Sequence, residues 1–245
     1  MTMPTLLLTQ ISHRFTRPGT QPIKVLEDVT LKIEQGQLVS CVGPSGCGKS
    51  TLARIIAGYI QPDSGSVQIE GRSVSVPGRD RILIDQDNDL FNWMSVQENL
   101  NLVSKDLTLI KQYLKWADLD SFAHAYPAQL SGGMKKRIAL IRAIVSRIPF
   151  IIMDEPFASL DYFTREHIHN MVRSLVAETG TTVFLVTHDI EEAIYLSDKV
   201  IVLSSRPAHI IRSHDTSQFR SEDLQVKDAP DFIKLKKQIR SELFS

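Results

Sequence analysis

The segment Gly43–Ser50, with the sequence GPSGCGKS, constrains the fold of this chain more than any other feature. It fits the pattern G-x-x-x-x-G-K-[ST] and lies between the apolar run Leu38–Val42 and the helix-like segment Thr51–Ala57. A strand that enters a glycine-rich loop and continues as a helix surrounds one small volume with unpaired backbone N–H groups and the positive end of the helix dipole. Because this arrangement binds phosphate, the sequence predicts an α/β fold that binds a nucleoside triphosphate.

Two residues of the loop have distinct expected roles. Lys49 would reach the β- and γ-phosphates of the nucleotide, and the Ser50 hydroxyl would bind Mg²⁺. The loop alone does not distinguish a kinase, a GTPase or a motor. The predicted nucleotide-binding residues are Gly43, Pro44, Ser45, Gly46, Cys47, Gly48, Lys49, Ser50 and Thr51.

The apolar run Phe150–Met153 is closed by two acidic residues, Asp154 and Glu155. The run is too short for a buried helix and is typical of a central parallel strand, whose carboxyl end lies at the ligand edge of an α/β sheet. We expect Asp154 to hold Mg²⁺ through a water molecule, and Glu155 to polarise the attacking water as general base. Taken alone, the pair could also form a helix cap or a surface turn, which Pro156 favours.

A second glycine-rich helix start lies at Leu130–Met134, with the sequence LSGGM, and an amphipathic pattern continues from it to about Arg147. Ser131 suits an N-cap, and Gly132 and Gly133 leave the backbone bare, which is compatible with a second anion site. On its own the pattern favours a capped helix with a flexible entry. Its position between the phosphate loop and the strand ending in two acids resembles the ATP-binding-cassette (ABC) ATPases, whose signature is Leu-Ser-Gly-Gly. The resemblance covers roughly residues 5–210.

The resemblance implies an α/β fold with a P-loop NTPase (RecA-like) core, an antiparallel β subdomain and an inserted helical subdomain. Residues 1–215 would form the ATPase domain, with the helical subdomain at about 87–148, and residues 216–245 a C-terminal helical tail. The periodicity of the chain agrees, because it is helical from about 87 to 148. Strands are expected at about 6–15, 25–33, 37–42, 81–85, 150–153, 182–186 and 199–203.

Four smaller features follow the order of the family, and the resemblance assigns a role to each. Gln86 would contact Mg²⁺ or the lytic water, and His188 would contact the γ-phosphate. Asp161 belongs to a loop, Ser159–Asp161, that crosses the dimer interface in the family, and Phe15 would stack on adenine. Without this context Gln86 would be a solvated loop residue, Asp161 an N-cap, His188 a structural residue and Phe15 a core aromatic.

In the family two cassettes dimerise head to tail, so that ATP lies between the phosphate loop of one and the Ser-Gly-Gly segment of the other. The resemblance therefore implies a second ABC ATPase subunit as partner, in a homodimer or a heterodimer. One chain would supply Lys49, Ser50, Gln86, Asp154, Glu155 and His188 to each site. Its partner would supply Ser131, Gly132, Gly133 and Asp161.

Several short segments resemble the ATPase subunits of the nitrate/sulfonate/taurine importer group. They are Leu90–Asn99, Met134, Met153–Phe157 and Ser204–Pro207. This likeness implies a membrane permease and, indirectly, a periplasmic or extracellular substrate-binding protein as partners. The chain would sit peripherally at the cytoplasmic face of the inner membrane. The alternative is an ABC ATPase without a transport role, with a regulatory or mechanical function of the cell-division or soluble type.

The chain departs from that group at a few positions. Lys135 and Lys136 stand where Arg or Gln is common, and Asp85 begins an acidic stretch with Asp87 and Asp89. We expect this stretch either to meet a basic helix of the permease or to be a solvated loop. Trp93 would be a docking residue or part of the subdomain core.

The composition limits the remaining possibilities. The chain has 245 residues with 28 basic and 28 acidic side chains, which argues against charge-driven nucleic-acid binding. There is no apolar run long enough to span a bilayer and no signal peptide, so we expect a soluble, cytosolic chain. Of the two cysteines, Cys41 should be inert, while the field of Lys49 and the helix start should favour the thiolate of Cys47.

The last thirty residues carry one helical pattern. The apolar residues Phe232, Leu235, Ile239 and Leu243 share one face of a helix that begins at about Pro230. We expect this helix to dock on the core of the same chain, and the alternative is a contact with a partner or a second subunit.

Overall fold

A computed structural model of the chain describes residues 6–16, 18–85, 90–158, 160–220 and 224–243. Within them, one sheet has six strands in the order β10-β9-β3-β8-β7-β6. The strands from β9 to β6 pair in parallel, and β10 pairs antiparallel to β9 at the edge. Their bounds are β3 Leu38–Val42, β6 Arg81–Ile84, β7 Phe150–Asp154, β8 Thr182–Val186, β9 Lys199–Leu203 and β10 Ile210–Asp215.

The order of these strands determines where the site lies. The central strands β3, β8 and β7 are buried along their whole length, as expected for strands covered on both faces. Because they are parallel neighbours, their carboxyl ends meet at one edge of the sheet. The phosphate loop follows β3, Glu155 follows β7, and Thr187 and His188 follow β8. The fold therefore gathers these segments from distant parts of the sequence.

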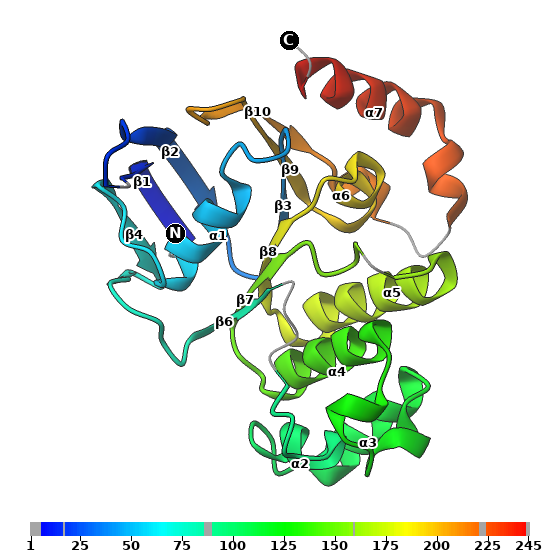
Figure 1. Cartoon of the computed structure of the whole chain (residues 1–245). Coiled ribbons are helices and arrows are strands. Elements are labelled where there is room, and N and C mark those ends of the chain that lie inside the picture. The colour runs from blue at the N-terminus through cyan, green and yellow to red at the C-terminus, as the bar shows by residue number, and fades with distance from the viewer. Residues whose placement is uncertain (1–5, 17, 86–89, 159, 221–223, 244–245) are drawn as a thin grey trace.

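A second, four-stranded antiparallel sheet has the order β2-β1-β4-β5 and lies beside α1 (Figure 1). Its apolar face shares a buried cluster with the apolar residues of α1. The strands expected at 6–15 and 25–33 are confirmed, whereas β4, β5 and β10 were not predicted. The bounds are β1 Leu6–Phe15, β2 Ile23–Ile33, β4 Ser64–Ile69, β5 Arg72–Ser73 and α1 Lys49–Ala57.

The segment between β6 and β7 contains helices that form one region at the lower end of the molecule in Figure 1. They are α2 Val96–Asn101, α3 Leu107–Trp116 and α4 Gly132–Val145, with 3₁₀ turns at Asp120–Phe122 and Pro127–Gln129. A capping box of Ser95 and Glu98 begins α2, and the Asp106 side chain caps α3. The helical character expected here is confirmed. The segment is, however, divided into short helices rather than helical throughout.

The C-terminal part of the chain returns to the core. Helix α5 (Tyr162–Thr179) precedes β8, and α6 (Ile190–Leu196) follows it. After 3₁₀ turns at Ser217–Phe219 and Leu224–Asp228, α7 (Pro230–Leu243) packs beside α6 and β9. Phe232 and Ile239 are fully buried, so docking on the core of the same chain is confirmed. Among the described helices none has the length and apolar character to cross a membrane.

Candidate nucleotide site

The phosphate loop joins β3 to α1 as the sequence predicts. Gly46 and Gly48 have φ values of 72° and 131°, which L side chains rarely adopt. A Cβ atom at Gly48 would lie 2.7 Å from Val25 Cγ1, so both the backbone and the packing require glycine there. Lys49 is buried, and its Nζ donates hydrogen bonds to the carbonyl oxygens of Gly43 (2.8 Å) and Pro44 (3.0 Å). The ammonium group is therefore held over its own loop.

A cavity of about 640 Å³ lies beside this loop. One wall is apolar and comes from the β1–β2 region, with Phe15, Ile23 and Val25, while the other is polar. Phe15 is 44% exposed and its ring is held edge-on by His13, with the ring centroids 4.8 Å apart. The alternative that Phe15 is a core aromatic is therefore wrong. The polar lining consists of Thr16, Thr20, Ser45, Gly46, Gly48, Lys49, Ser50, Thr51, Glu155 and Arg206.

Asp154 ends β7 and is 2% exposed. Burial raises the pKa of its carboxyl group, a hydrogen bond from Ser50 opposes this shift, and the charges of Asp85 and Glu155 add to it. Its Oδ1 atom is buried and has no hydrogen-bond partner. A carboxylate oxygen with unused lone pairs beside a hydroxyl is the kind of hard oxygen set that Mg²⁺ accepts. The residues present therefore fit the metal.

Glu155 follows Asp154 in an unusual backbone conformation. Its φ of 50° places a residue other than glycine in the left-handed region, and its N–H donates to the Val186 carbonyl at 2.9 Å. Such a conformation costs roughly 1–3 kcal/mol and persists only where the surroundings impose it. The Glu155 carboxylate lines the cavity, and its Oε2 lies 3.4 Å from His188 Nδ1. The structure thus brings two of the four predicted catalytic residues, Glu155 and His188, together.

The Ser-Gly-Gly segment lies elsewhere. The Ser131 hydroxyl accepts a hydrogen bond from the Met134 N–H (3.2 Å) and caps α4, and no atom lies within 4 Å of a Cβ built at Gly132. Asp161 caps α5 through the Thr164 N–H (3.0 Å), which lowers the pKa of its carboxyl group. The residues that line the cavity do not include Ser131, Gly132, Gly133 or Asp161. Within one chain, the second expected anion site is separate from the first.

Two residues near the site were not predicted to act there. Arg206, after β9, donates from Nε to the Gly46 carbonyl and lines the cavity, where its charge would attract phosphate. It was noted only as part of a group-specific segment. Its position after a strand adjacent to β3 was the available signal. Lys136 of α4 lies close enough to Glu155 for that carboxylate to raise its pKa, although burial outweighs this and lowers it.

The expectation for Cys47 was wrong. The side chain is 1% exposed, and burial raises the pKa of the thiol despite the opposing influence of Lys49. Its Sγ lies against Gly43, inside the loop rather than facing the cavity. The thiol form is therefore favoured, and rapid alkylation at this site is no longer expected. Cys41 is buried in β3, as anticipated.

Gln86, Asp87, Asp89 and Ser159 lie outside the described residues. Of the acidic stretch, Asp85 is described, and it pairs with Arg54 at 3.1 Å. Its charge is therefore partly neutralised within the chain. Trp93 is 72% exposed and its ring contacts that of Phe91 in a tilted arrangement, with ring centroids 5.2 Å apart, so the alternative that it belongs to the subdomain core is wrong.

Comparison with known proteins agrees with this geometry. The ABC transporter family model matches residues 26–158. An aliphatic sulfonates import ATP-binding protein of Bacillus cereus is 35% identical, over 96% of this chain and 94% of the relative. A taurine import ATP-binding protein of Jannaschia sp. (strain CCS1) is 36% identical, over 97% and 93%. A dimeric ATP-binding cassette in a post-hydrolysis state, bound to ADP and Pi, superposes with a TM-score of 0.76 at 30% identity, over 86% of this chain and 98% of that one.

The fold and the site define a P-loop ATPase of the cassette type. The chain belongs to the ABC transporter family. The predicted fold class, ATP binding and ATPase activity are thereby confirmed, as is the expectation of an importer ATPase subunit.

Proposed function

We propose that this chain hydrolyses ATP with its own loop and carboxylates, and completes each site with the Ser-Gly-Gly segment of a second cassette. The observation that carries the proposal is that the Ser-Gly-Gly start of α4 lies apart from the nucleotide cavity of the same chain. The cavity contains the phosphate loop, Phe15 and Glu155, whereas the cap of α4 is exposed and lies outside it. A helix start with bare N–H groups that lies outside the cavity of its own chain suits an anion held by a partner.

The roles of individual residues follow from their positions. Lys49 and the loop N–H groups would hold the phosphates, Phe15 would stack on the base, and Ser50 and Asp154 would hold Mg²⁺. Bound Mg²⁺ would neutralise charge on the phosphate oxygens. Glu155 would accept a proton from the attacking water, and His188, 3.4 Å from it, would orient this carboxylate and contact the γ-phosphate. Gln86 remains a candidate for the water or the metal.

The partners follow from the relatives and from the surface. We infer that a membrane permease docks near the exposed pair Phe91 and Trp93, and that the transported solute is a small sulfonate such as taurine. A substrate-binding protein would deliver the solute, and the chain would lie at the cytoplasmic face of the membrane.

The ATPase domain would comprise residues 1–215, with a helical subdomain at about 87–148, and residues 216–245 would form the tail.

The test is the Glu155→Gln variant, which removes the base and keeps the shape. With ATP and Mg²⁺ it should form a stable dimer by light scattering, and a tagged form should recover a polytopic membrane protein from solubilised host membranes. Glu178→Gln, an exposed residue at the end of α5, is the matched control and should remain monomeric under the same conditions. A monomer at saturating ATP would contradict the shared site. Recovery of soluble partners alone would favour the non-transport alternative.

A further inference from the structure

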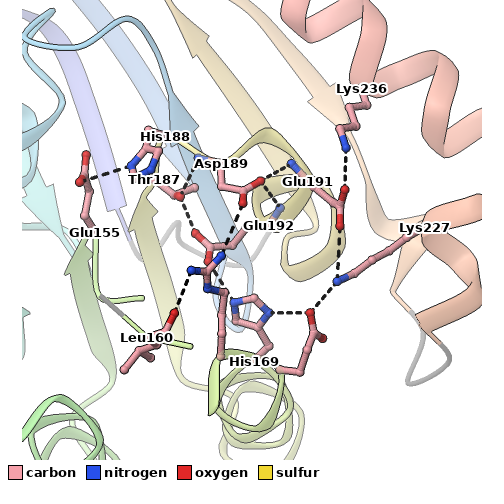
Figure 2. A network of polar contacts seen from close by, with 12 residues as sticks. Glu155, Leu160, His169, Thr187, His188, Asp189, Glu191, Glu192, Lys227 and Lys236 are labelled. Atoms are coloured by element: carbon pink, nitrogen blue, oxygen red, sulfur yellow. Dashed lines mark hydrogen bonds and ion pairs between the residues drawn. The ribbon is translucent and has the colours of Figure 1, made fainter. Parts of the chain in front are cut away.

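The turn that carries His188 is fastened to the inside of the molecule. Thr187, 2% exposed, accepts a hydrogen bond from the Asp189 N–H (3.1 Å) and donates from its hydroxyl to Glu192 Oε2. Asp189 Oδ1 in turn accepts from the N–H groups of Glu191 (2.9 Å) and Glu192 (3.2 Å) at the start of α6. Figure 2 shows these contacts below and to the right of the His188 ring. The Thr187 hydroxyl thus links the Asp189 N–H, on the other side of His188, to the buried Glu192 carboxylate.

That carboxylate has a second partner from a different helix. Glu192 is 6% exposed, and its Oε1 accepts a hydrogen bond from Nε2 of His169 (3.0 Å), which is 2% exposed on α5. Since Oε2 is taken by Thr187, both oxygens of Glu192 are occupied. The His169 ring is itself fixed edge-on against Phe157, with centroids 4.8 Å apart. The pair therefore joins α5 to the β8–α6 turn through one defined geometry.

The far side of His169 leads to the C-terminal tail. Its Nδ1 lies 4.0 Å from Glu166 Oε1, beyond hydrogen-bond distance but within range of an ion pair. Glu166 pairs with Lys227 at 2.7 Å, and Lys227 also lies 3.7 Å from Glu191 of α6. The tail therefore closes this side of the cluster with a half-buried ammonium group.

Stability alone does not account for a buried Glu–His pair. Removing a carboxylate and an imidazole from water is costly, and apolar side chains of similar volume often stabilise a core equally well or better. The pair instead fixes side-chain orientation. His169 and Thr187 both donate to the Glu192 carboxylate, so the carboxylate has one orientation and in turn holds the Thr187 side chain in place. The residue next to Thr187 is the one that meets Glu155.

We propose that Glu192 and His169 are positioning residues that hold His188 at its place opposite Glu155. This rests on the proposed roles of Glu155 and His188. Neither Glu192 nor His169 lines the cavity beside the phosphate loop. Glu192 lines a smaller hollow together with Thr187, His188 and Glu155, and the proposed effect on His188 passes through the Thr187–Asp189 turn. Loss of the His169 donor leaves Glu192 free to rotate, and the His188 ring then samples orientations that do not face Glu155.

The test compares His169→Leu with His169→Gln in the full chain. Leucine keeps much of the volume and removes the donor, whereas the Nε2 amide of glutamine can still donate to Glu192. We expect His169→Leu to lower kcat for ATP about 10-fold with KM changed less than 2-fold, and His169→Gln to recover most of the rate. Equal kcat values for the leucine variant and the wild type would overturn the proposal, as would equal losses in both variants.

A double mutant separates positioning from general destabilisation. If His169 acts through His188, adding His169→Leu to His188→Ala should produce no further loss of kcat, because coupled residues are not additive. If the losses of kcat in the two single variants add fully in the double variant, and the melting temperature falls in parallel, His169 has only a structural role and the proposal is wrong.

A readout without hydrolysis distinguishes failure of this inference from failure of the proposed function. The His188 ring resonances of the nucleotide-free chain should shift or broaden in His169→Leu. In the control His167→Leu, which removes another histidine of α5, they should stay unchanged. If His188→Ala retains full activity while the resonances still move, the assigned role of His188 is wrong and the positioning stands. If the resonances do not move, the positioning is wrong.

Discussion

The two glycine-containing helix starts of this chain share a composition and differ in almost every physical respect. The start of α1 is buried, has glycines at positive φ, and is enclosed by Val25, Leu26 and Arg206. The start of α4 is exposed, has a serine cap, and leaves Gly132 with open space around it. The first is shaped before any ligand arrives. The start of α4 presents exposed backbone N–H groups outside the nucleotide cavity of its own chain. The same residue types can therefore form a complete binding site in one place and only part of a binding site in another.

The largest expected effect concerns the finished site. Glu155→Gln should lower kcat by about 10²–10⁴-fold, because a positioned general base contributes that much, while ATP binding by the single chain should persist. Steady-state hydrolysis and equilibrium binding of a fluorescent ATP analogue measure the two quantities. Loss of binding equal to the loss of rate would mean that Glu155 shapes the cavity rather than the chemistry.

A pair of alanine variants addresses the comparison directly. Gly48→Ala should abolish measurable ATP binding by the single chain, since the new Cβ would lie 2.7 Å from Val25 and the φ of 131° is strained for alanine. Gly132→Ala meets no atom within 4 Å and should leave binding by the single chain within about 2-fold, while impairing the ATP-dependent dimer. Calorimetry and light scattering separate these outcomes. Equal losses of monomer binding in both variants would remove the distinction.

Phe15→Ala should weaken ATP binding by about 10-fold, since stacking of a base on an aromatic ring contributes roughly 1–3 kcal/mol. The melting temperature should hardly change, because the ring is 44% exposed and contributes little to the core. Ile23→Ala, in the same wall of the cavity, is the control for lost apolar area without an aromatic face. If both variants bind equally, the ring does not stack.

A subtler prediction concerns pH. Burial raises the pKa of Asp154 in the folded chain above its value in the unfolded chain, so the folded state favours the protonated form. The free energy of unfolding should therefore fall as pH rises from the ordinary carboxyl range through the raised folded pKa of Asp154, relative to Asp154→Asn. Denaturant titrations of both chains across this range measure the difference. Parallel curves would show that Asp154 titrates normally.

The smallest effect is expected at the tail. Lys227→Gln removes the ion pairs with Glu166 and Glu191, which should lower the free energy of unfolding by about 1 kcal/mol. Changes in kcat should stay below those of His169→Leu, because Lys227 lies one step further from His188. The effect should shrink at high salt. A larger loss of rate than in His169→Leu would place the tail closer to the catalytic turn than the structure suggests.

The features that were predicted from the sequence depend on local patterns, whereas several that were missed depend on contacts between distant segments. The buried strands at 38–42, 150–154 and 182–186 were foreseen because they are continuous apolar runs, and the loop because its glycines follow one of them. β4 was missed because its sequence, SGSVQI, begins with three small residues that have low strand preference. The burial of Cys47, and the approach of Lys136 and Arg206 to the site, depend on how separate segments fold over one another. No local pattern contains that information.

The pairing of the central strands also determines at what stage of synthesis the nucleotide site can form. Leu38 of β3 pairs with Val183 of β8, so the strand that carries the phosphate loop pairs with a strand far downstream in the sequence. Contacts between residues so distant in sequence form slowly and depend on the intervening chain being in place. A growing polypeptide displays its phosphate loop long before β8 has been synthesised. The ability to bind nucleotide should therefore appear only after β8 and β9 have been synthesised and have paired with β3, rather than accumulate gradually before then.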